Sequence, residues 1–143
     1  MLRYKLNGQE FYKQVRHFHW TDWPDRGVPP CRLTAMVILS HVRGTKKPIT
    51  VHCSAGIGRT GAVVAIEFIS ERLQTGHSCE AMDEILKELR NYRPYSIQTD
   101  SQYLYVHRVM LFYFVEKYKI GSNMEDFMAM YRRFVDDYNR LVV

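Results

Sequence analysis

The stretch VHCSAGIGRTG, residues 51–61, constrains the fold of this chain more than any other feature. Apolar and β-branched residues lead into Cys53, and small residues then lead into the long apolar segment GAVVAIEFIS. This order is typical of a buried strand, a tight loop and a core helix. Gly56–Gly61 also matches G-x-G-x-x-G, the pattern of dinucleotide-binding loops. A loop of this kind can hold phosphate groups, and the flanking sequence indicates which ligand fits.

Neither nucleotide-binding interpretation fits that flanking sequence. A dinucleotide fold needs another strand and an acidic residue about 20 positions beyond the glycines. The segment found there, QTGHSCEAMDEILKEL, is polar and has helical periodicity. A P-loop needs Gly-Lys-Ser/Thr, whereas Gly61 is followed by Ala62.

The same loop suits a simple oxyanion beside a reactive thiol. Inward-pointing N–H groups and a helix N-terminus favour negative charge, and glycine permits the backbone shape that this requires. Arg59 follows Cys53 by six positions and can grip two phosphate oxygens with its planar fork. Such surroundings lower a cysteine pKa from roughly 8.5 to about 3.5–7.5 and give a thiolate nucleophile. A buried, inert cysteine before a tight turn is the alternative interpretation.

Periodicity and turn signals predict a hairpin around Asn7-Gly8, a short buried strand and five helices. The strands are LRYKL, the run ending in QVRHFHW, and PITVHC at 48–53. The helices are 32–44, 58–74, 79–92, 100–118 and one that begins at Ser122, with Glu125 placed for a capping box. The last helix carries an aromatic stripe that we interpret as packing: Phe127, Tyr131, Phe134 and Tyr138.

The predicted fold class is α/β, with a small sheet that has a parallel βαβ core and an N-terminal hairpin, covered by about five helices. Ligands bind beyond the carboxyl ends of parallel strands. The loop that contains Trp23-Pro24-Asp25 should therefore lie beside the cysteine loop. Three candidate strands are fewer than the roughly 5–6 of a mean sheet, so we expect apolar surface to stay exposed and self-association to be possible.

Composition narrows the partners and the cellular setting. The formal net charge is +5, but the basic residues are scattered, which favours phosphorylated small groups or peptides over nucleic acid. Three cysteines without paired spacing indicate reduced thiols and a cytoplasmic location. The longest apolar run, VMLFYFV, is too short to span a bilayer, and MLRYKLNGQEFY is not expected to be a signal peptide.

The segment HCSAGIGRTG resembles the signature of the cysteine-dependent protein tyrosine phosphatases. Trp23-Pro24-Asp25 resembles the mobile acid loop of that family, and Gln98–Tyr103 resembles its glutamine loop, which points to the phosphotyrosine-specific branch. The resemblance covers residues 1–119 and implies the C-terminal portion of a catalytic domain. Residues 120–143 then form an extra amphipathic helix of unassigned role.

The resemblance implies hydrolysis of phosphotyrosine on proteins through a cysteinyl-phosphate, with no cofactor and no metal. Cys53 attacks phosphorus, Asp25 protonates the tyrosine oxygen, and Thr60 donates a hydrogen bond to the departing thiolate. Gln98 and Gln102 position the water that attacks the intermediate. The implied substrate-binding residues are Ser54, Ala55, Gly56, Ile57, Gly58, Arg59 and Gln102. The implied supporting residues are His52, Trp23 and Arg93.

Several of these residues also have a purely structural interpretation. Trp23-Pro24-Asp25 is compatible with an ordinary turn. Thr99 with Gln102 satisfies a helix capping box, which could also fix the loop that carries Gln98. His52 could be a core histidine on a strand, and the pair Arg90 and Arg93 could be a solvated helix end.

The resemblance also implies an incomplete fold. The family domain is longer and has an N-terminal half, which carries the tyrosine-recognition loop and several strands. By the same resemblance, Tyr95 lies at the pocket rim, where its bulk would restrict substrates. The alternative function is therefore an inactive or phosphate-binding remnant.

Overall fold

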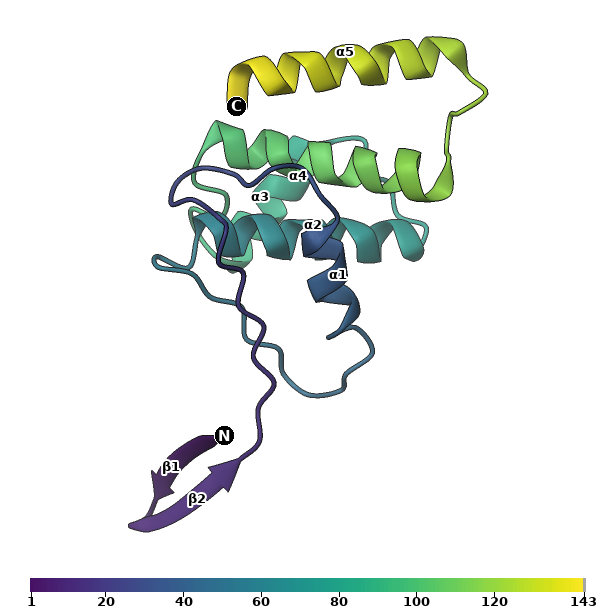
Figure 1. Cartoon of the computed structure of the whole chain (residues 1–143). Coiled ribbons are helices and arrows are strands. Elements are labelled where there is room, and N and C mark those ends of the chain that lie inside the picture. Colours follow the sequence, from purple (N-terminus) through teal and green to yellow (C-terminus); the bar gives the residue numbers. More distant parts are fainter. Residues whose placement is uncertain (143) are drawn as a thin grey trace.

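Helices form the body of the molecule, and a two-stranded hairpin projects from it (Figure 1). The computed structural model describes residues 1–142. Its elements are β1 (Leu2–Leu6), β2 (Gln9–Lys13), α1 (Thr34–Ser40), α2 (Gly58–Gln74), α3 (Met82–Tyr92), α4 (Asp100–Phe112), the π-helical turn η1 (Tyr113–Lys117) and α5 (Glu125–Val142). Helix α4 packs between α2 and α5, and α1 and α3 each pack against α2.

The hairpin around Asn7-Gly8 is confirmed. Strands β1 and β2 pair antiparallel, with Leu2 opposite Lys13. Asn7 and Gly8 have φ values of 49° and 81°, as a two-residue turn between antiparallel strands requires. All residues of both strands are exposed, including Tyr4 and Phe11, whose rings stack at 5.5 Å. The hairpin therefore has an uncovered apolar face.

The structure differs from the expected parallel βαβ core. Among residues 1–142, the only sheet is the β1–β2 hairpin, and residues 48–53 form no strand. Ile49 and Val51 in that segment are 52% and 38% exposed. A strand needs neighbours for its N–H and C=O groups, and the described residues supply none at this place. The strand predicted from the β-branched pattern of PITVHC is therefore wrong, because that pattern does not reveal whether a neighbouring strand is available.

The core lies where α2 crosses α4. Helix α2 contributes small and branched residues to it, and its buried members of the core are Ala62, Ala65, Ile66 and Ile69. Helix α4 contributes Tyr105, Val106, Val109 and Met110. The alanines let the two helices approach closely, while Ile66 is fully buried. Truncating such a residue to alanine costs about 2–5 kcal/mol, so this contact holds the start of α2, and with it the cysteine loop, in place.

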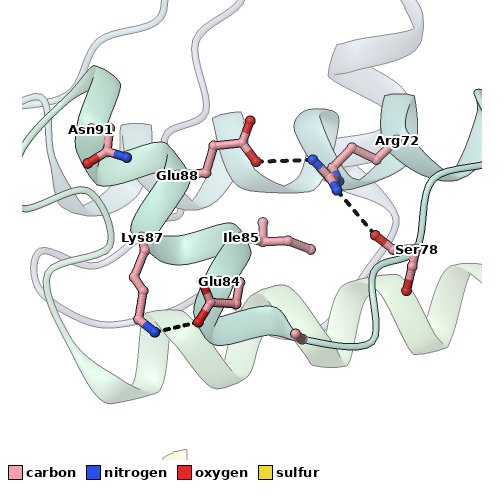
Figure 2. A pocket seen from close by; sticks show the side chains of 8 residues that line it. Arg72, Ser78, Glu84, Ile85, Lys87, Glu88 and Asn91 are labelled. Atoms are coloured by element: carbon pink, nitrogen blue, oxygen red, sulfur yellow. Dashed lines mark hydrogen bonds and ion pairs between the residues drawn. The ribbon is translucent and has the colours of Figure 1, made fainter.

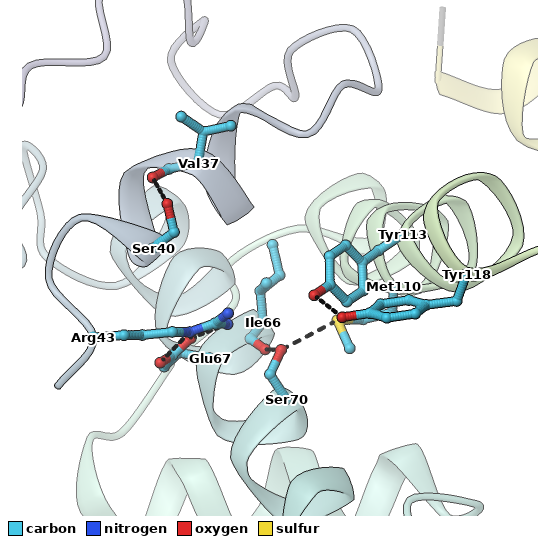
Figure 3. A network of polar contacts seen from close by, with 9 residues as sticks. All are labelled: Val37, Ser40, Arg43, Ile66, Glu67, Ser70, Met110, Tyr113 and Tyr118. Carbon is cyan, nitrogen blue, oxygen red and sulfur yellow. Dashed lines mark hydrogen bonds and ion pairs between the residues drawn. The ribbon is translucent and has the colours of Figure 1, made fainter.

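Polar contacts fasten α1 and α4 to α2 (Figure 3). Arg43, just after α1, donates from Nε to both carboxylate oxygens of Glu67 at 2.8 and 2.9 Å. These hydrogen bonds hold the pKa of Arg43 above its ordinary value. Ser70 Oγ donates to the Ile66 carbonyl at 2.7 Å and lies 4.0 Å from Met110 Sδ of α4. The segment that precedes the cysteine loop is thus tied to the middle of α2.

The aromatic stripe of the last helix is confirmed as packing. Tyr131 and Tyr138 are buried, and Phe127 and Phe134 are half-buried. Arg108 of α4 donates to the Tyr131 hydroxyl at 3.1 Å, which joins α4 to α5.

Several helix starts and ends differ from the sequence prediction. Helix α1 begins at Thr34 and not at 32, α3 begins at Met82 and not at 79, and α4 ends at Phe112, where η1 follows. Helix α5 begins at Glu125 and not at Ser122, because backbone turns occupy residues 119–124. Helix α1 ends at Ser40, and the chain then turns through Gly44, whose φ is +78°. Among the described residues, no helix has the length and apolar character needed to cross a membrane.

Candidate active site

The cysteine loop leads directly into the N-terminus of α2. The Gly56 N–H lies 3.2 Å from Cys53 Sγ, pointing at the sulfur. Gly56 has a φ of +71°, and a Cβ there would lie 2.7 Å from Nη2 of Arg93. The positive φ favours glycine at this position, whereas the contact with the end of the Arg93 side chain could be relieved by movement of that side chain. No side chain caps the start of α2, and its first turn has no acidic residue, so the helix end is available to an anion.

These surroundings lower the pKa of the Cys53 thiol from 9.0 to about 7. Partial burial is the largest single influence and acts in the opposite direction, because it disfavours the charged thiolate. Hydrogen bonds from Thr60 and from the Gly56 N–H, together with the charge of Arg59, outweigh it. The loop thus lowers the pKa of Cys53 toward neutral pH, which is the direction that the sequence predicts.

The Thr60 hydroxyl is buried close to this sulfur. Among residues 1–142 it has no partner that meets hydrogen-bond geometry, yet it is one of the groups that lower the pKa of Cys53. We therefore treat Thr60 as a donor with spare capacity for a charged sulfur.

Arg59 joins the cysteine loop to the acid loop. Its Nη2 donates to Ser54 Oγ at 2.7 Å and to Asp25 Oδ1 at 3.1 Å. Its Nη1 donates to the Trp23 carbonyl at 3.3 Å. The two loops lie side by side as predicted, although the parallel sheet that motivated the prediction is not formed. Arg59 is thus placed between the thiol and the candidate proton donor.

The acid loop is a turn with a buried anchor. Trp23 is buried, stacks edge-on against Tyr105 of α4 at 5.3 Å, and donates from Nε1 to the Gly27 carbonyl at 3.0 Å. The Gly27 N–H donates to the Pro24 carbonyl at 3.3 Å, which is the ordinary turn that the sequence also allowed. Asp25 projects from this turn with its side chain 75% exposed. The turn and the acid-loop interpretations are therefore compatible.

The glutamine loop lies against the start of α2. A Cβ on Gly58 would lie 2.9 Å from both amide atoms of Gln102 and 3.1 Å from Oε1 of Gln98. Gln102 is 1% exposed, and its Oε1 accepts from the Gln98 N–H at 3.0 Å. Thr99 caps α4 by accepting from the Gln102 N–H at 3.2 Å, which is one half of the predicted capping box. The other half is not formed, because the Gln102 side chain accepts from the N–H of Gln98 and not from that of Thr99. Gln102 thus lies in the interior and fixes the backbone of Gln98, which itself is exposed. The structure therefore gives no support to the direct contact of Gln102 with substrate or water that the sequence predicted, because its side chain is buried and already bonded.

Arg93 reaches the cysteine loop and His52 does not. Arg93 Nε donates to the Gly56 carbonyl at 2.6 Å, which places it across the loop as a brace. His52 is exposed, and within the described part of the chain its ring makes no hydrogen bond. The structure therefore gives no support to the supporting role predicted for His52, because the strand that would have buried its ring is not paired.

One contact that sequence reasoning missed explains the third glycine of the loop. The Ile97 N–H donates to the Ile57 carbonyl at 3.0 Å. A Cβ on Gly61 would lie only 2.5 Å from the Ile97 nitrogen. Gly61 therefore serves a close approach between two backbones and not a bound dinucleotide. An unexplained glycine in the first turn of a helix was the available signal.

A cleft of about 420 Å³ between the end of α2 and α3 is not this site (Figure 2). Its charged side chains pair with one another, as in the 3.0 Å contact of Arg72 with Glu88 and the 2.5 Å contact of Lys87 with Glu84. None of the predicted site residues lines it.

Comparison with known proteins agrees with this geometry. A sequence model of the protein-tyrosine phosphatase family matches residues 1–112. The chain is 35% identical over 114 residues to Tyrosine-protein phosphatase Lar-like of Caenorhabditis elegans, which covers 77% of this chain and 5% of that protein. It is 37% identical over 107 residues to Receptor-type tyrosine-protein phosphatase F of Homo sapiens, covering 71% of this chain and 6% of that protein. It is 35% identical over 109 residues to Receptor-type tyrosine-protein phosphatase S of Gallus gallus, covering 73% and 7%.

The chain spans only a small part of the length of these relatives, from 5% to 7% in the three cases given. The matched region contains the cysteine loop, the acid loop and the glutamine loop. The family match over residues 1–112 agrees with the site geometry. The pKa of Cys53 is lowered, and Arg59 contacts the carboxylate of Asp25 beside the cysteine loop. The chain belongs to the protein-tyrosine phosphatase family.

Proposed function

We propose that this chain hydrolyses phosphotyrosine on proteins or peptides through a cysteinyl-phosphate intermediate. The observation that carries the proposal is the position of Arg59 between the loop of Cys53, whose pKa is about 7, and the carboxylate of Asp25. Phosphate-ester cleavage needs a nucleophile, positive charge for the phosphoryl oxygens and a proton for the leaving oxygen. These three groups meet at the N-terminus of α2.

In the first step, the Cys53 thiolate forms a bond to phosphorus while the bond from phosphorus to the tyrosine oxygen breaks. Asp25 gives its proton to that oxygen, so tyrosine leaves neutral. Arg59, the N–H groups of residues 54–58 and the end of α2 hold the phosphoryl oxygens. In the second step, water attacks phosphorus, Asp25 accepts the proton, and the sulfur leaves as thiolate. Gln98 positions that water, and Gln102 acts by fixing the Gln98 backbone. Thr60 offers its hydroxyl to the departing sulfur.

The proposal is tested by turnover of a phosphotyrosine peptide and of an aryl phosphate by the full chain and by Cys53→Ser. We expect no turnover in Cys53→Ser and retained binding of orthophosphate, because serine keeps the loop shape without the thiolate. Arg59→Lys should lose both binding and rate, since lysine has no planar fork. Turnover by Cys53→Ser at a substantial fraction of the parent rate would contradict the covalent mechanism.

A second candidate is a phosphate-binding remnant without turnover. The uncovered hairpin face and the unpaired segment 48–53 favour it, because both are places where further structure would pack. This candidate predicts that the chain binds orthophosphate through Arg59 yet shows no phosphate release from any aryl phosphate.

The three cysteines are free thiols, which supports the prediction of a cytoplasmic location.

A further inference from the structure

Residues 94–98 form a loop that is held in an unfavourable backbone shape. Tyr95 and Ile97 have φ values of +65° and +63°, a region that residues with a side chain disfavour. Ile97 is branched at Cβ and buried, so its conformation is the costlier of the two. Such a shape persists only where the surroundings impose it.

Arg90, in the last turn of α3, holds the loop in that shape through hydrogen bonds to its backbone. Its Nε donates to the Ser96 carbonyl at 3.1 Å, and its Nη2 donates to the Ile97 carbonyl at 3.1 Å. The two donors of one rigid fork therefore fix two successive carbonyl groups. Ser96 adds a hydrogen bond from its Oγ to the Arg93 carbonyl at 2.8 Å.

Ile97 and Gln98 connect the cysteine loop to the glutamine loop. The Ile97 N–H donates to the carbonyl of Ile57, the residue directly before α2. The next N–H, that of Gln98, donates to Gln102 Oε1. Because Arg90 holds the Ile97 carbonyl, it determines how Gln98 stands relative to the end of the cysteine loop.

We infer that Arg90 is a positioning residue for this site: it sets the register between Gln98 and the cysteine loop through the carbonyls of Ser96 and Ile97. The inference rests on the proposed function for its kinetic consequence. The water that hydrolyses the cysteinyl-phosphate depends on Gln98, whereas formation of that intermediate depends on Cys53, Arg59 and Asp25. Loss of Arg90 should therefore slow the second step more than the first.

The test compares Arg90→Ala and Arg90→Lys with Lys87→Ala in the full chain. Lysine keeps the charge and loses the fork, so both Arg90 variants should behave alike. Lys87 lies on the same helix and forms its ion pairs with Asp83 and Glu84, and within the described residues it makes no hydrogen bond to the 94–98 loop, which makes it a matched control. Hydrogen exchange at the Ile97 amide should become about tenfold faster or more in the Arg90 variants and remain unchanged in Lys87→Ala.

Hydrogen exchange at the Ile66 amide, in the core, reports general loss of stability. Comparing it with exchange at Ile97 distinguishes a local positioning effect from global destabilisation. An equal acceleration at Ile66 and Ile97, or none at Ile97, would overturn the inference. This part of the test needs no turnover, so it stands even if the chain proves to be a remnant.

The kinetic part is a rapid-mixing measurement with an aryl phosphate. In Arg90→Ala we expect a burst of released phenol followed by a steady rate lowered about tenfold or more, because phosphorylated Cys53 accumulates. Equal slowing of the burst and of the steady rate would contradict a role through Gln98. Absence of turnover in the parent chain would contradict the proposed function, and the exchange comparison would then decide the inference about Arg90.

Discussion

Nη2 of Arg59 lies 3.1 Å from Oδ1 of Asp25, so the phosphate-binding cation and the candidate proton donor contact each other. Asp25 is largely exposed, and an exposed ion pair contributes about 0–1 kcal/mol. A doubly charged phosphate would displace the carboxylate at little cost. The carboxyl group would then be free beside the incoming ester oxygen. The contact therefore places Asp25 near its proposed point of action and makes it a weak competitor for the anion.

Asp25→Asn should have opposite effects on rate and on binding. Rate on phosphotyrosine should fall by roughly 10²–10⁴-fold, because general acid catalysis is lost. A substrate whose leaving group is stable without a proton should lose much less. Orthophosphate should bind slightly more tightly, since asparagine does not compete for Arg59. Turnover of the two substrates and calorimetric titration measure these effects, and equal rate losses on both substrates would exclude Asp25 as the proton donor.

The Cys53 thiol should react with iodoacetamide with a pH midpoint of about 7. The same pKa predicts how stability changes with pH. Because the folded pKa is lower than the unfolded value, the folded chain binds fewer protons between pH 7 and 9. Stability relative to Cys53→Ser should therefore rise from pH 7 to pH 9 and be lost as the pH falls through 7. A midpoint near 8.5 would show that the loop does not activate the thiol.

Thr60→Val should separate the stability of the site from its chemistry. Valine has nearly the shape of threonine and removes a buried hydroxyl that lacks a geometric partner, so stability should be unchanged or slightly higher. The pKa of Cys53 should rise, because one of the groups that lower it is gone. Thermal unfolding and the pH profile of alkylation provide the two measurements. A large loss of stability would mean that the hydroxyl has a structural partner.

Tyr95→Gly should relieve strain and open the site. Tyr95 has a φ of +65° and is 76% exposed, so glycine removes a backbone cost and loses little packing. We expect a stability change within about 1 kcal/mol, on the stabilising side. Turnover of a phosphotyrosine peptide should rise relative to a small aryl phosphate, since the rim becomes smaller. Tyr92→Ala, which removes an exposed tyrosine from α3 without a positive φ, is the control; the same gain there would argue against a rim effect.

The candidate site was more predictable from the sequence than the fold around it. Cys53, Arg59 and Asp25 belong to short motifs whose chemistry needs those residue types, and the structure brings their loops together. The helices were predictable because their apolar periodicity is local. The sheet was not, because a strand depends on neighbours that the periodicity of 48–53 cannot reveal. Likewise, nothing local indicates that Ile97 approaches Gly61, since that contact joins distant segments.

The uncovered apolar surfaces should make the chain self-associate. One is the hairpin face with Tyr4 and Phe11, whose strands also carry Arg3, Lys5 and Lys13. The other is a groove of about 500 Å³ beside α2. Its apolar lining residues are Leu39, Val42, Ile49, Val51, Val63, Val64 and Phe68. Its polar lining residues are Glu67, Glu71, Glu88, Arg72, Thr75 and His77. Charge contributes little to this match, because Glu67 and Glu88 of the groove already pair with Arg43 and Arg72, and Lys5 of the hairpin pairs with Glu10. Apolar contact favours the association. We therefore predict that the groove contacts the hairpin of a second copy.

Phe11→Lys on the hairpin and Val64→Lys in the groove should each shift the chain toward monomer, because each places a charge on an apolar contact surface. Met130→Lys, an exposed position on α5 away from both surfaces, should not change the association. Light scattering after size exclusion over a range of concentrations measures the mass. If the parent chain is a monomer at all concentrations, the expected association between copies does not occur and this assignment is wrong. If all three variants associate like the parent, another surface carries the contact and this assignment is wrong.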